Sequence, residues 1–365
     1  MRIKRLVVDA QLMEHPEVSR IAKALNLVPE PVEDQNLVFE LIKNDPDPWE
    51  KGKRILWLRQ NKAVFFKKCP GTREYLCCGY QILHFGSYCT MDCAYCILQT
   101  YFHPPVLQYF VNHESLFDEL ETVFAQKKCM RIGTGEFTDS LIWEPWTDLT
   151  PSLVNTFSTQ KHAVLELKTK STAIERLLKP IKHERKTILS WSLNTPRVIQ
   201  TQERGTASLE ARLRAAARAE KSGYPLAFHF DPMILYPGCD EEYHRVVDAL
   251  FKAVSAENIV WISLGTFRFM PALEPIIKKR FPDSDIVYGE FIPGLDGKMR
   301  YFKPLRIDLY RRMVSWIQCR APELLVYLCM EDEAVWQQSF GFSPKNSDEL
   351  ANMLDNSARK HCDLQ

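Results

Sequence analysis

The 365-residue chain lacks several features that would place it in whole classes of protein. No run of about 18 apolar residues occurs, so membrane-spanning helices are not expected. Residues 1–10 include basic side chains but no apolar segment of the kind an export signal needs, which predicts a cytoplasmic location. Internal repeats and low-complexity segments are also missing. We therefore expect a globular protein, and a hydrophobic content of 45% is enough for a substantial core.

The chain has almost no net charge. A formal value of +1 gives no overall attraction to nucleic acid, so any polyanion site must be a local patch. Two stretches, residues 51–73 and 298–312, combine basic residues with aromatic residues and could form such a patch. Basic residues can hold phosphates while aromatic rings take unstacked bases. On charge alone, a solvated surface is the favoured interpretation. The basic residues are Lys51, Lys53, Arg54, Arg59, Lys62, Lys67, Lys68 and Arg73 in the first stretch, and Lys298, Arg300, Lys303, Arg306, Arg311 and Arg312 in the second.

Eleven cysteines are spread along this chain, which favours reduced thiols and a metal site over disulfides. Cys89, Cys93 and Cys96 form a C-x3-C-x2-C motif without a fourth cysteine. Structural zinc sites have four protein ligands and ordinary 4Fe-4S clusters have four thiolates, so three thiolates predict a 4Fe-4S cluster with one iron open to another ligand. Alternatively, these are buried free cysteines, or a zinc site completed by a more distant residue; His84 and Cys77-Cys78 lie just upstream.

Six apolar, β-branched segments alternate with expected helices. This alternation predicts a parallel α/β fold. The simplest arrangement of six such strands is an open, partial (β/α)6 barrel. The clearest helix spans residues 208–222, with Ser208 as N-cap and Gly223 after its end. The expected strands are Ile82–Phe85, Met130–Gly133, Ala163–Leu167, Thr187–Leu193, Leu226–Phe230 and Ile259–Leu264.

Polar and charged residues follow these strands. Functional residues of parallel barrels gather at the carboxyl ends of the strands. Lys168 and Lys170 share one face of their strand, so alternation does not choose between them. The other candidates are the three cysteines, Gly135 and Glu136, Ser192 and Asn194, His229 and Asp231, and Arg268.

The cysteine motif resembles that of radical S-adenosylmethionine (SAM) enzymes. In that superfamily, SAM chelates the open iron, and an electron from the cluster cleaves SAM to a 5'-deoxyadenosyl radical. Tyr95 matches an aromatic residue common before the third cysteine. The segment 131–136 is similar to a glycine-rich element, so the resemblance implies that Gly135 lets the backbone approach SAM and that Glu136 binds the methionine ammonium.

The order of the motifs resembles the spore photoproduct lyase family over most of the chain. The resemblance implies a lyase that repairs thymine-dimer-type DNA lesions, with Lys170 and Ser192 near SAM and Tyr95 as a radical-relay residue. It also implies an electron donor such as flavodoxin or ferredoxin. The matching segments are residues 6–16, 93–100, 167–171, 191–196 and 203–208.

Two positions depart from the family. The hydrogen-donor cysteine of the lyase falls at or beside Phe137, and its second relay tyrosine is Ile97. Without that thiol, a substrate radical cannot be quenched by the lyase's route; Cys239 and Cys329 lie near expected strand ends. Two alternatives therefore remain: the same radical chemistry on another substrate, or a nucleic-acid-binding protein with a structural metal centre.

The chain is expected to have three parts. Residues 1–80 form an amino-terminal α/β extension, residues 81–292 the partial barrel, and residues 293–365 a carboxyl-terminal extension. The second basic stretch lies in the last part, where the lyase presents its DNA-contacting region, so DNA or another nucleic acid is the expected partner.

Overall fold

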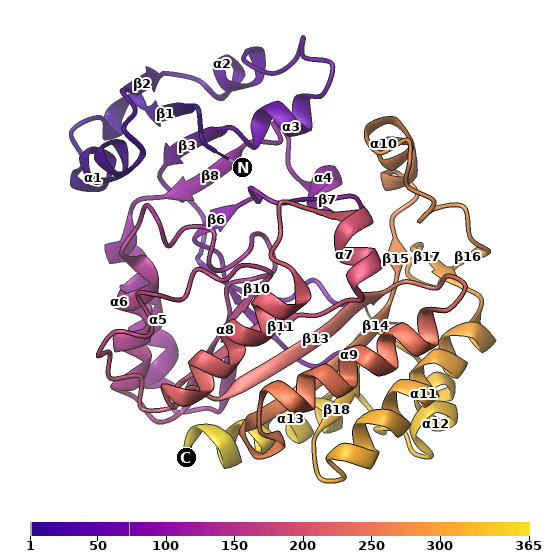
Figure 1. The fold of residues 1–365 in the computed structure, drawn as a ribbon. Coiled ribbons are helices and arrows are strands. Elements are labelled where there is room, and N and C mark those ends of the chain that lie inside the picture. The colour runs from indigo at the N-terminus through magenta and orange to yellow at the C-terminus, as the bar shows by residue number, and fades with distance from the viewer. Residues whose placement is uncertain (1, 73) are drawn as a thin grey trace.

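The computed structural model describes residues 2–72 and 74–365, and a curled sheet forms its centre (Figure 1). Within these residues the sheet has eight strands in the order β18-β14-β13-β11-β10-β9-β5-β4. Strand β4 is antiparallel to β5, and the other neighbours pair in parallel. The strands are β4 (Phe66–Lys68), β5 (Gln81–Leu83), β9 (Met130–Gly133), β10 (Ala163–Thr169), β11 (Thr187–Ser192), β13 (Leu226–Met233), β14 (Ile259–Thr266) and β18 (Val326–Leu328).

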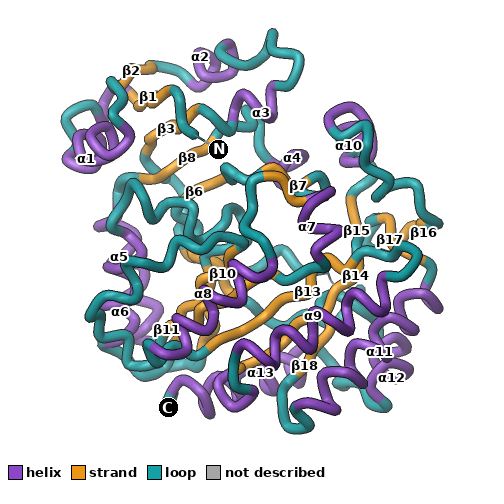
Figure 2. Tube along the Cα trace, viewed as in Figure 1, coloured by secondary structure: helices purple, strands orange, loops and turns teal. Residues whose placement is uncertain are grey.

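All six strands expected from the sequence are present in this sheet, which confirms the partial barrel. Near-continuous apolar segments predicted them because a parallel sheet is covered on both faces. Helices surround the strands, as the tube view in Figure 2 shows. The helices in this part of the chain are α4 (Leu98–Tyr101), α5 (His113–Ala125), α6 (Leu149–Ser158), α7 (Pro196–Gln202), α8 (Leu209–Lys221), α9 (Cys239–Ala253), α10 (Leu273–Arg280), α11 (Lys303–Arg320), α12 (Glu333–Phe340) and α13 (Ser347–Cys362), of which α10 packs against α4 and stands apart from the main sheet.

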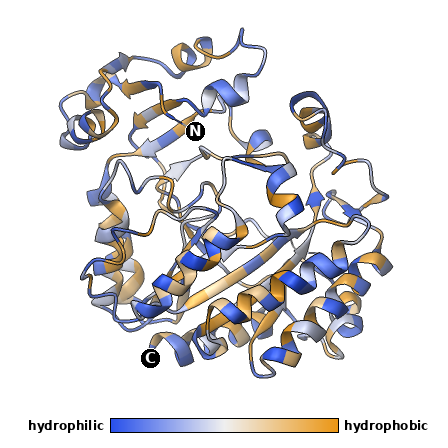
Figure 3. Ribbon diagram, in the orientation of Figure 1, coloured by the Kyte–Doolittle hydropathy of each residue, from blue (hydrophilic) through white to orange (hydrophobic). Residues whose placement is uncertain are grey.

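Helix α8 confirms the helix expected at residues 208–222. The Ser208 hydroxyl accepts a hydrogen bond from the Ala211 N–H at 3.3 Å, which satisfies one of the free donors at the helix start. Gly223 follows with a φ of +85°, a conformation that glycine adopts without steric cost. Helices α8 and α9 carry hydrophilic and hydrophobic residues side by side (Figure 3), as expected for helices with one covered face.

A second sheet contains most of the amino-terminal part. Its order is β2-β1-β3-β8-β6, and it lies beyond the end of the main sheet in Figure 1. Helices α1 (Pro16–Leu25), α2 (Gln35–Glu40) and α3 (Pro48–Gly52) accompany it. Its strands are β1 (Arg5–Asp9), β2 (Pro29–Val32), β3 (Ile55–Arg59), β6 (Gly86–Ser87) and β8 (Leu107–Phe110).

Strand pairing crosses both domain boundaries expected from the sequence. Strands β6 and β8 lie after residue 80 but belong to the amino-terminal sheet, while β4 lies before it and belongs to the main sheet. Strand β18, from the expected carboxyl-terminal extension, pairs with β14 at the edge of the main sheet. The division into three parts therefore stays a proposal. Strands from neighbouring parts are hydrogen-bonded to one another in the same sheets.

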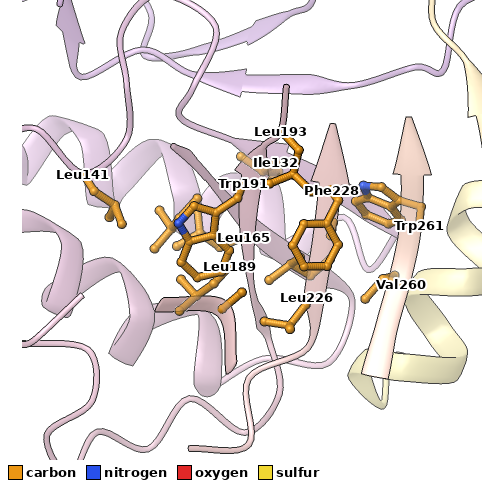
Figure 4. Close-up of a cluster of buried hydrophobic side chains, with 14 of the residues drawn as sticks. Ile132, Leu141, Leu165, Leu189, Trp191, Leu193, Leu226, Phe228, Val260 and Trp261 are labelled. Atoms are coloured by element: carbon orange, nitrogen blue, oxygen red, sulfur yellow. The ribbon is translucent and has the colours of Figure 1, made fainter. Parts of the chain in front are cut away.

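Large apolar side chains fill the space around the strands (Figure 4). Trp191 and Trp261 are each no more than 1% exposed, and Leu165, Leu226 and Phe228 are fully buried. Burying such a side chain contributes about 1.5–3 kcal/mol, so these strands are fixed firmly in place. In the described residues, no helix is both long and apolar enough to cross a membrane.

Candidate active site

A cavity of about 330 Å³ lies at the carboxyl ends of the main-sheet strands. It contains side chains within or just beyond the last residues of β9, β10, β11, β13 and β14, which is where the sequence places chemistry in a parallel barrel. Of the strand-end candidates, Asn194 does not line this cavity. The predicted metal-binding, cofactor-binding and catalytic residues all line it, although their roles stay predictions. These are Cys89, Cys93, Tyr95, Cys96, Gly135, Glu136, Lys170 and Ser192.

The three motif cysteines are held in a loop that includes β7 (Asp92–Cys93). This strand pairs with β12 (Glu203–Arg204), where Glu203 is opposite Cys93. A zinc ion lies about 2.3 Å from each thiolate, so its sulfur ligands must be within about 4 Å of one another. In residues 2–72 and 74–365, no three His, Cys, Asp or Glu side chains are placed to hold one metal ion. The three thiols facing one cavity fit a cluster, in which each thiolate binds its own iron.

Two basic residues anchor this cysteine loop. Lys53 is 1% exposed, and its ammonium donates to the carbonyl oxygens of Cys89 at 3.1 Å and Met91 at 2.6 Å. Arg280 of α10 donates to the Asp92 carboxylate at 3.0 Å. The loop is thus fixed by contacts from residues about 40 positions before it and 190 after it.

The first basic stretch is therefore not a uniform solvated surface. Besides Lys53, the guanidinium of Arg59 stacks on Trp57 at 4.0 Å, and Lys67 contacts His84 at 3.2 Å. Lys62 and Lys68 are exposed. Arg73, which the sequence assigned to this stretch, lies outside the described residues.

Lys170 and Tyr95 lie near the same buried carboxylate, that of Glu203. The Tyr95 hydroxyl donates to Glu203, which also forms an ion pair with Arg212 at 2.5 Å. The Lys170 ammonium lies 5.6 Å from the centre of the Tyr95 ring. Burial alone would lower the pKa of Lys170, but the nearby Glu203 carboxylate and Cys93 outweigh it and raise that pKa. Lys170 therefore brings a positive charge to the cavity beside the cysteine loop.

The glycine-rich turn after β9 brings Gly135 and Glu136 to the cavity. A methyl group on Gly135 would lie 2.9 Å from the Lys168 Cβ, so only glycine lets the two strand ends approach this closely. Glu136 lines the cavity with an exposed side chain, and desolvation by the surrounding protein raises the pKa of its carboxyl group.

Asp139 is a cavity residue that was not among the site residues predicted from the sequence. Its carboxylate accepts hydrogen bonds from the Lys170 N–H at 2.8 Å and the Thr169 hydroxyl at 2.8 Å. It therefore fixes the backbone that carries Lys170. The sequence offered one signal for Asp139, which is its position after β9, three residues beyond Glu136. Its hydrogen-bond partners, Thr169 and Lys170, belong to the end of the next strand and could not be inferred from that position.

Three polar residues that line the cavity, Glu166, His229 and Ser263, contact one another. His229 contacts the Ser263 hydroxyl at 2.6 Å and the Glu166 carboxylate at 2.7 Å. Burial and the charge of Lys168 lower the pKa of His229 despite the opposing effect of Glu166. Lys168 lines the cavity together with Lys170, and Asp231 pairs with Arg268 at 3.2 Å.

Phe137 packs away from the cavity residues. Its ring centre lies 4.7 Å from that of His84 and 6.3 Å from that of Phe102, and the side chain is half-buried. Of the two cysteines considered as substitutes for the missing donor, Cys329 lines the cavity and Cys239 does not.

The second basic stretch is largely neutralised by acidic partners. Arg300 pairs with Asp296 at 2.8 Å and Arg306 with Glu331 at 3.0 Å, and both arginines are at most 3% exposed. Lys303 pairs with Asp332 at 2.8 Å, and Arg312 with Asp240 and Asp308. The charge pattern of this stretch therefore overstates the positive charge that a polyanion would meet. Lys298 lines the cavity, 3.5 Å from Asp296.

Comparisons with known proteins agree with this arrangement. Residues 26–291 match the family model for spore photoproduct lyase. The spore photoproduct lyase of Bacillus subtilis (strain 168) is 25% identical over 253 residues, covering 68% of this chain and 72% of that protein. The corresponding protein of Clostridium acetobutylicum is 24% identical over 264 residues, covering 72% and 74%.

Solved structures are similar in fold. A mutant spore photoproduct lyase with bound AdoMet and dinucleoside spore photoproduct has a TM-score of 0.79 at 19% identity, over 89% of this chain and 98% of that one. A spore photoproduct lyase complexed with dinucleoside spore photoproduct has a TM-score of 0.77 at 19% identity, with the same coverage. At this identity the likeness establishes the fold, a curled half-barrel with a parallel sheet.

Proposed function

The chain belongs to the spore photoproduct lyase family, and on that premise we propose that it is a radical SAM enzyme that repairs thymine-dimer-type DNA lesions. The observation that carries the proposal is the cavity itself. It gathers three thiols without a fourth motif ligand, a glycine-rich turn with a carboxylate, and a buried lysine at the carboxyl ends of parallel strands.

Cys89, Cys93 and Cys96 would hold a 4Fe-4S cluster. When bound, the cluster supplies the electron that cleaves SAM to methionine and a 5'-deoxyadenosyl radical. Cys89 and Cys93 are buried, and Cys96 is half-buried beside the open cavity. The chain thus keeps water from most of the sulfur ligands while leaving one side of the site accessible.

SAM carries an ammonium and a carboxylate, and the cavity offers a charge for each. Glu136 would bind the ammonium, while Gly135 allows the SAM methionine to approach the backbone. Lys170 would balance negative charge near the cysteines, and Ser192 contributes a hydroxyl at the end of the next strand. Tyr95, fixed by Glu203, would act as the relay residue in hydrogen return.

A second candidate function is the same radical chemistry on another substrate. Phe137 favours it, because no thiol stands at the position of the family's hydrogen donor. A structural zinc centre in a nucleic-acid-binding protein is disfavoured by two observations. The motif thiols are not spaced for a single ion, and the second basic stretch is mostly paired.

The test is to reconstitute the protein anaerobically, reduce it with dithionite, and measure 5'-deoxyadenosine from SAM with and without dinucleoside spore photoproduct. The expected result is 5'-deoxyadenosine formation together with thymine products, and loss of both in Cys93→Ala. Cleavage of SAM without any thymine product would support the second candidate. Retained 5'-deoxyadenosine in Cys93→Ala would refute the cluster assignment. We expect that a reduced flavodoxin or ferredoxin can take the place of dithionite and support 5'-deoxyadenosine formation.

A further inference from the structure

Cys77 and Cys78 are adjacent in the chain, and their thiols contact each other. The Cys78 thiol donates a hydrogen bond to the Cys77 sulfur. Both are free cysteines, and neither belongs to the C-x3-C-x2-C motif. Cys78 lines the cavity, whereas Cys77 is half-buried outside its lining. The proposed radical chemistry uses neither thiol.

The surroundings of Cys77 favour its thiolate. The hydrogen bond from Cys78, followed by the Gly79 N–H and the charge of Arg131, lowers the pKa of Cys77 despite its partial burial. Arg131 is fixed at this place because it donates to the Cys78 carbonyl at 2.5 Å and to Asp355 at 2.6 Å. Cys77 is therefore the nucleophilic thiol of the pair, since the thiolate is the form that attacks a disulfide.

Cys78 has the opposite character. The hydrogen bond that it donates to Cys77, together with burial, raises the pKa of its thiol well above the usual value. A half-exposed thiol with a lowered pKa beside a second thiol is the arrangement found in redox-sensing cysteines, in which the second thiol resolves the first product. The structure thus gives the two neighbours different roles.

The backbone fixes the segment that carries the pair. The Cys77 N–H donates to the Ser347 hydroxyl at 3.0 Å, and the Leu76 N–H donates to the Glu331 carbonyl at 3.1 Å. A methyl group on Gly71 would lie 2.7 Å from the Cys77 Sγ, so the turn at that glycine packs directly on the sulfur. These contacts hold the Cys77 thiol against its neighbour.

A bond between adjacent cysteines would be readily reversible. Neighbouring Cα atoms are about 3.8 Å apart across a trans peptide, which is closer than in most disulfides. A disulfide made at this separation is strained, and strained disulfides are the labile ones that serve regulation rather than structure.

From this geometry we propose that Cys77 and Cys78 are a redox modification site, at which a low-molecular-weight disulfide such as glutathione disulfide converts the two thiols to a vicinal disulfide. The Cys77 thiolate attacks the oxidant, forms a mixed disulfide and releases one glutathione thiolate. The Cys78 thiol then loses its proton to solvent and attacks the Cys77 sulfur, which releases the second. Two protein thiols are oxidised, and one glutathione disulfide is reduced to two glutathiones. Because Cys78 lines the cavity, this bond changes the cavity wall.

Peptide mass analysis tests the proposal without SAM or substrate, so its outcome is independent of the proposed function. The reconstituted protein is treated anaerobically with excess glutathione disulfide, alkylated in denaturant and digested with chymotrypsin. Cleavage after Tyr75 and Tyr80 separates the pair from the motif cysteines and from Cys69. We expect a peptide that contains both cysteines, carries no alkyl group and is lighter by two hydrogen atoms. An excess of reduced glutathione should restore the alkylated form.

Two serine variants separate the roles of the thiols. Cys78→Ser should accumulate glutathione on Cys77, because no neighbouring thiol remains to displace it. Cys77→Ser should leave Cys78 free of glutathione at the same oxidant concentration. Cys69→Ala, which removes another thiol of the cavity wall, and Cys319→Ala, which removes an exposed one, are the controls. Both should form the disulfide as the wild type does.

Three results would overturn the proposal. The first is a wild-type peptide in which Cys77 and Cys78 both stay alkylated. The second is a link between Cys69 and Cys77 in place of the vicinal bond. The third is glutathione on Cys78 in the Cys77→Ser variant, which would show that Cys77 is not the attacking thiol.

Discussion

The ammonium group of Lys53 donates a hydrogen bond to the carbonyl oxygen of Cys89 at a distance of 3.1 Å. A residue of the amino-terminal part thereby fixes the loop that carries the proposed cluster ligands. The same ammonium lies 3.6 Å from Asp92, whose carboxylate also receives the Arg280 guanidinium. The cysteine loop is therefore stabilised by contacts from outside the partial barrel.

Lys53→Met should weaken cluster binding. The substitution leaves the Cys89 and Met91 carbonyls without a donor in a buried site, which costs about 2–4 kcal/mol in the free energy of unfolding. Iron per chain after reconstitution and gel filtration, together with denaturant unfolding, measures the effect. Lys51→Met is the control, since Lys51 is more exposed and pairs with Asp45. Equal iron retention and stability in the two variants would show that Lys53 does not hold the loop.

Glu136→Ala should weaken SAM binding while leaving the cluster intact. Loss of a charged hydrogen bond of about 1.5–3 kcal/mol corresponds to a rise in Kd of roughly tenfold to a hundredfold. Calorimetric titration of SAM into the reconstituted protein gives the Kd, and iron analysis gives the cluster content. Glu290→Ala, at an exposed position outside the cavity, serves as control. An unchanged affinity for SAM would remove Glu136 from the site.

Tyr95→Phe should alter turnover more than folding. Glu203 keeps its ion pair with Arg212 when the tyrosine hydroxyl is removed, so the stability loss should be about 1 kcal/mol. If Tyr95 relays the returning hydrogen, the variant should form more 5'-deoxyadenosine per repaired lesion. Tyr101→Phe, which removes another hydroxyl at the cavity wall, should leave this ratio unchanged. A wild-type ratio in both variants would exclude the relay role.

His84 should make the protein less stable in mild acid. Its Nδ1 lies 3.2 Å from the Lys67 ammonium and its Nε2 lies 2.8 Å from the Ser87 hydroxyl. Burial, with a contribution from Lys67, lowers the pKa of His84 from 6.5 to about 3. Below pH 6.5 the unfolded chain binds a proton that the folded protein excludes, so stability is lost as pH falls toward 3 and is regained above 6.5.

The size of this effect can be measured by denaturant unfolding at two pH values. Between pH 7 and pH 5, His84→Gln should lose less stability than the wild type by about 1–2 kcal/mol, the smaller figure allowing for partial exposure of the ring. His244→Gln, at an exposed position, should show the wild-type pH dependence. If His84→Gln loses as much stability as the wild type, the imidazole does not contribute to the pH response.

The sequence by itself determined the strands of the partial barrel and several of the side chains that line its cavity. Apolar segments such as Thr187–Leu193 predict strands because both faces of a parallel sheet are covered, and parallel strands must end at a common edge. For that reason Cys93, Glu136 and the pair Lys168 and Lys170 could be assigned to one edge of the sheet without any knowledge of long-range contacts, and only the family resemblance selected Lys170.

Only the tertiary structure decided what charged and sulfur side chains do once the chain is folded. Lys53 and Arg306 belong to basic stretches in the sequence, yet one donates to the cysteine loop and the other pairs with Glu331. Cys78 and Cys329 are far apart in the chain, yet both line the cavity. The physical reason is that strand alternation and helix periodicity are local, whereas an ion pair or a shared ligand site depends on which distant segments the packed core brings together.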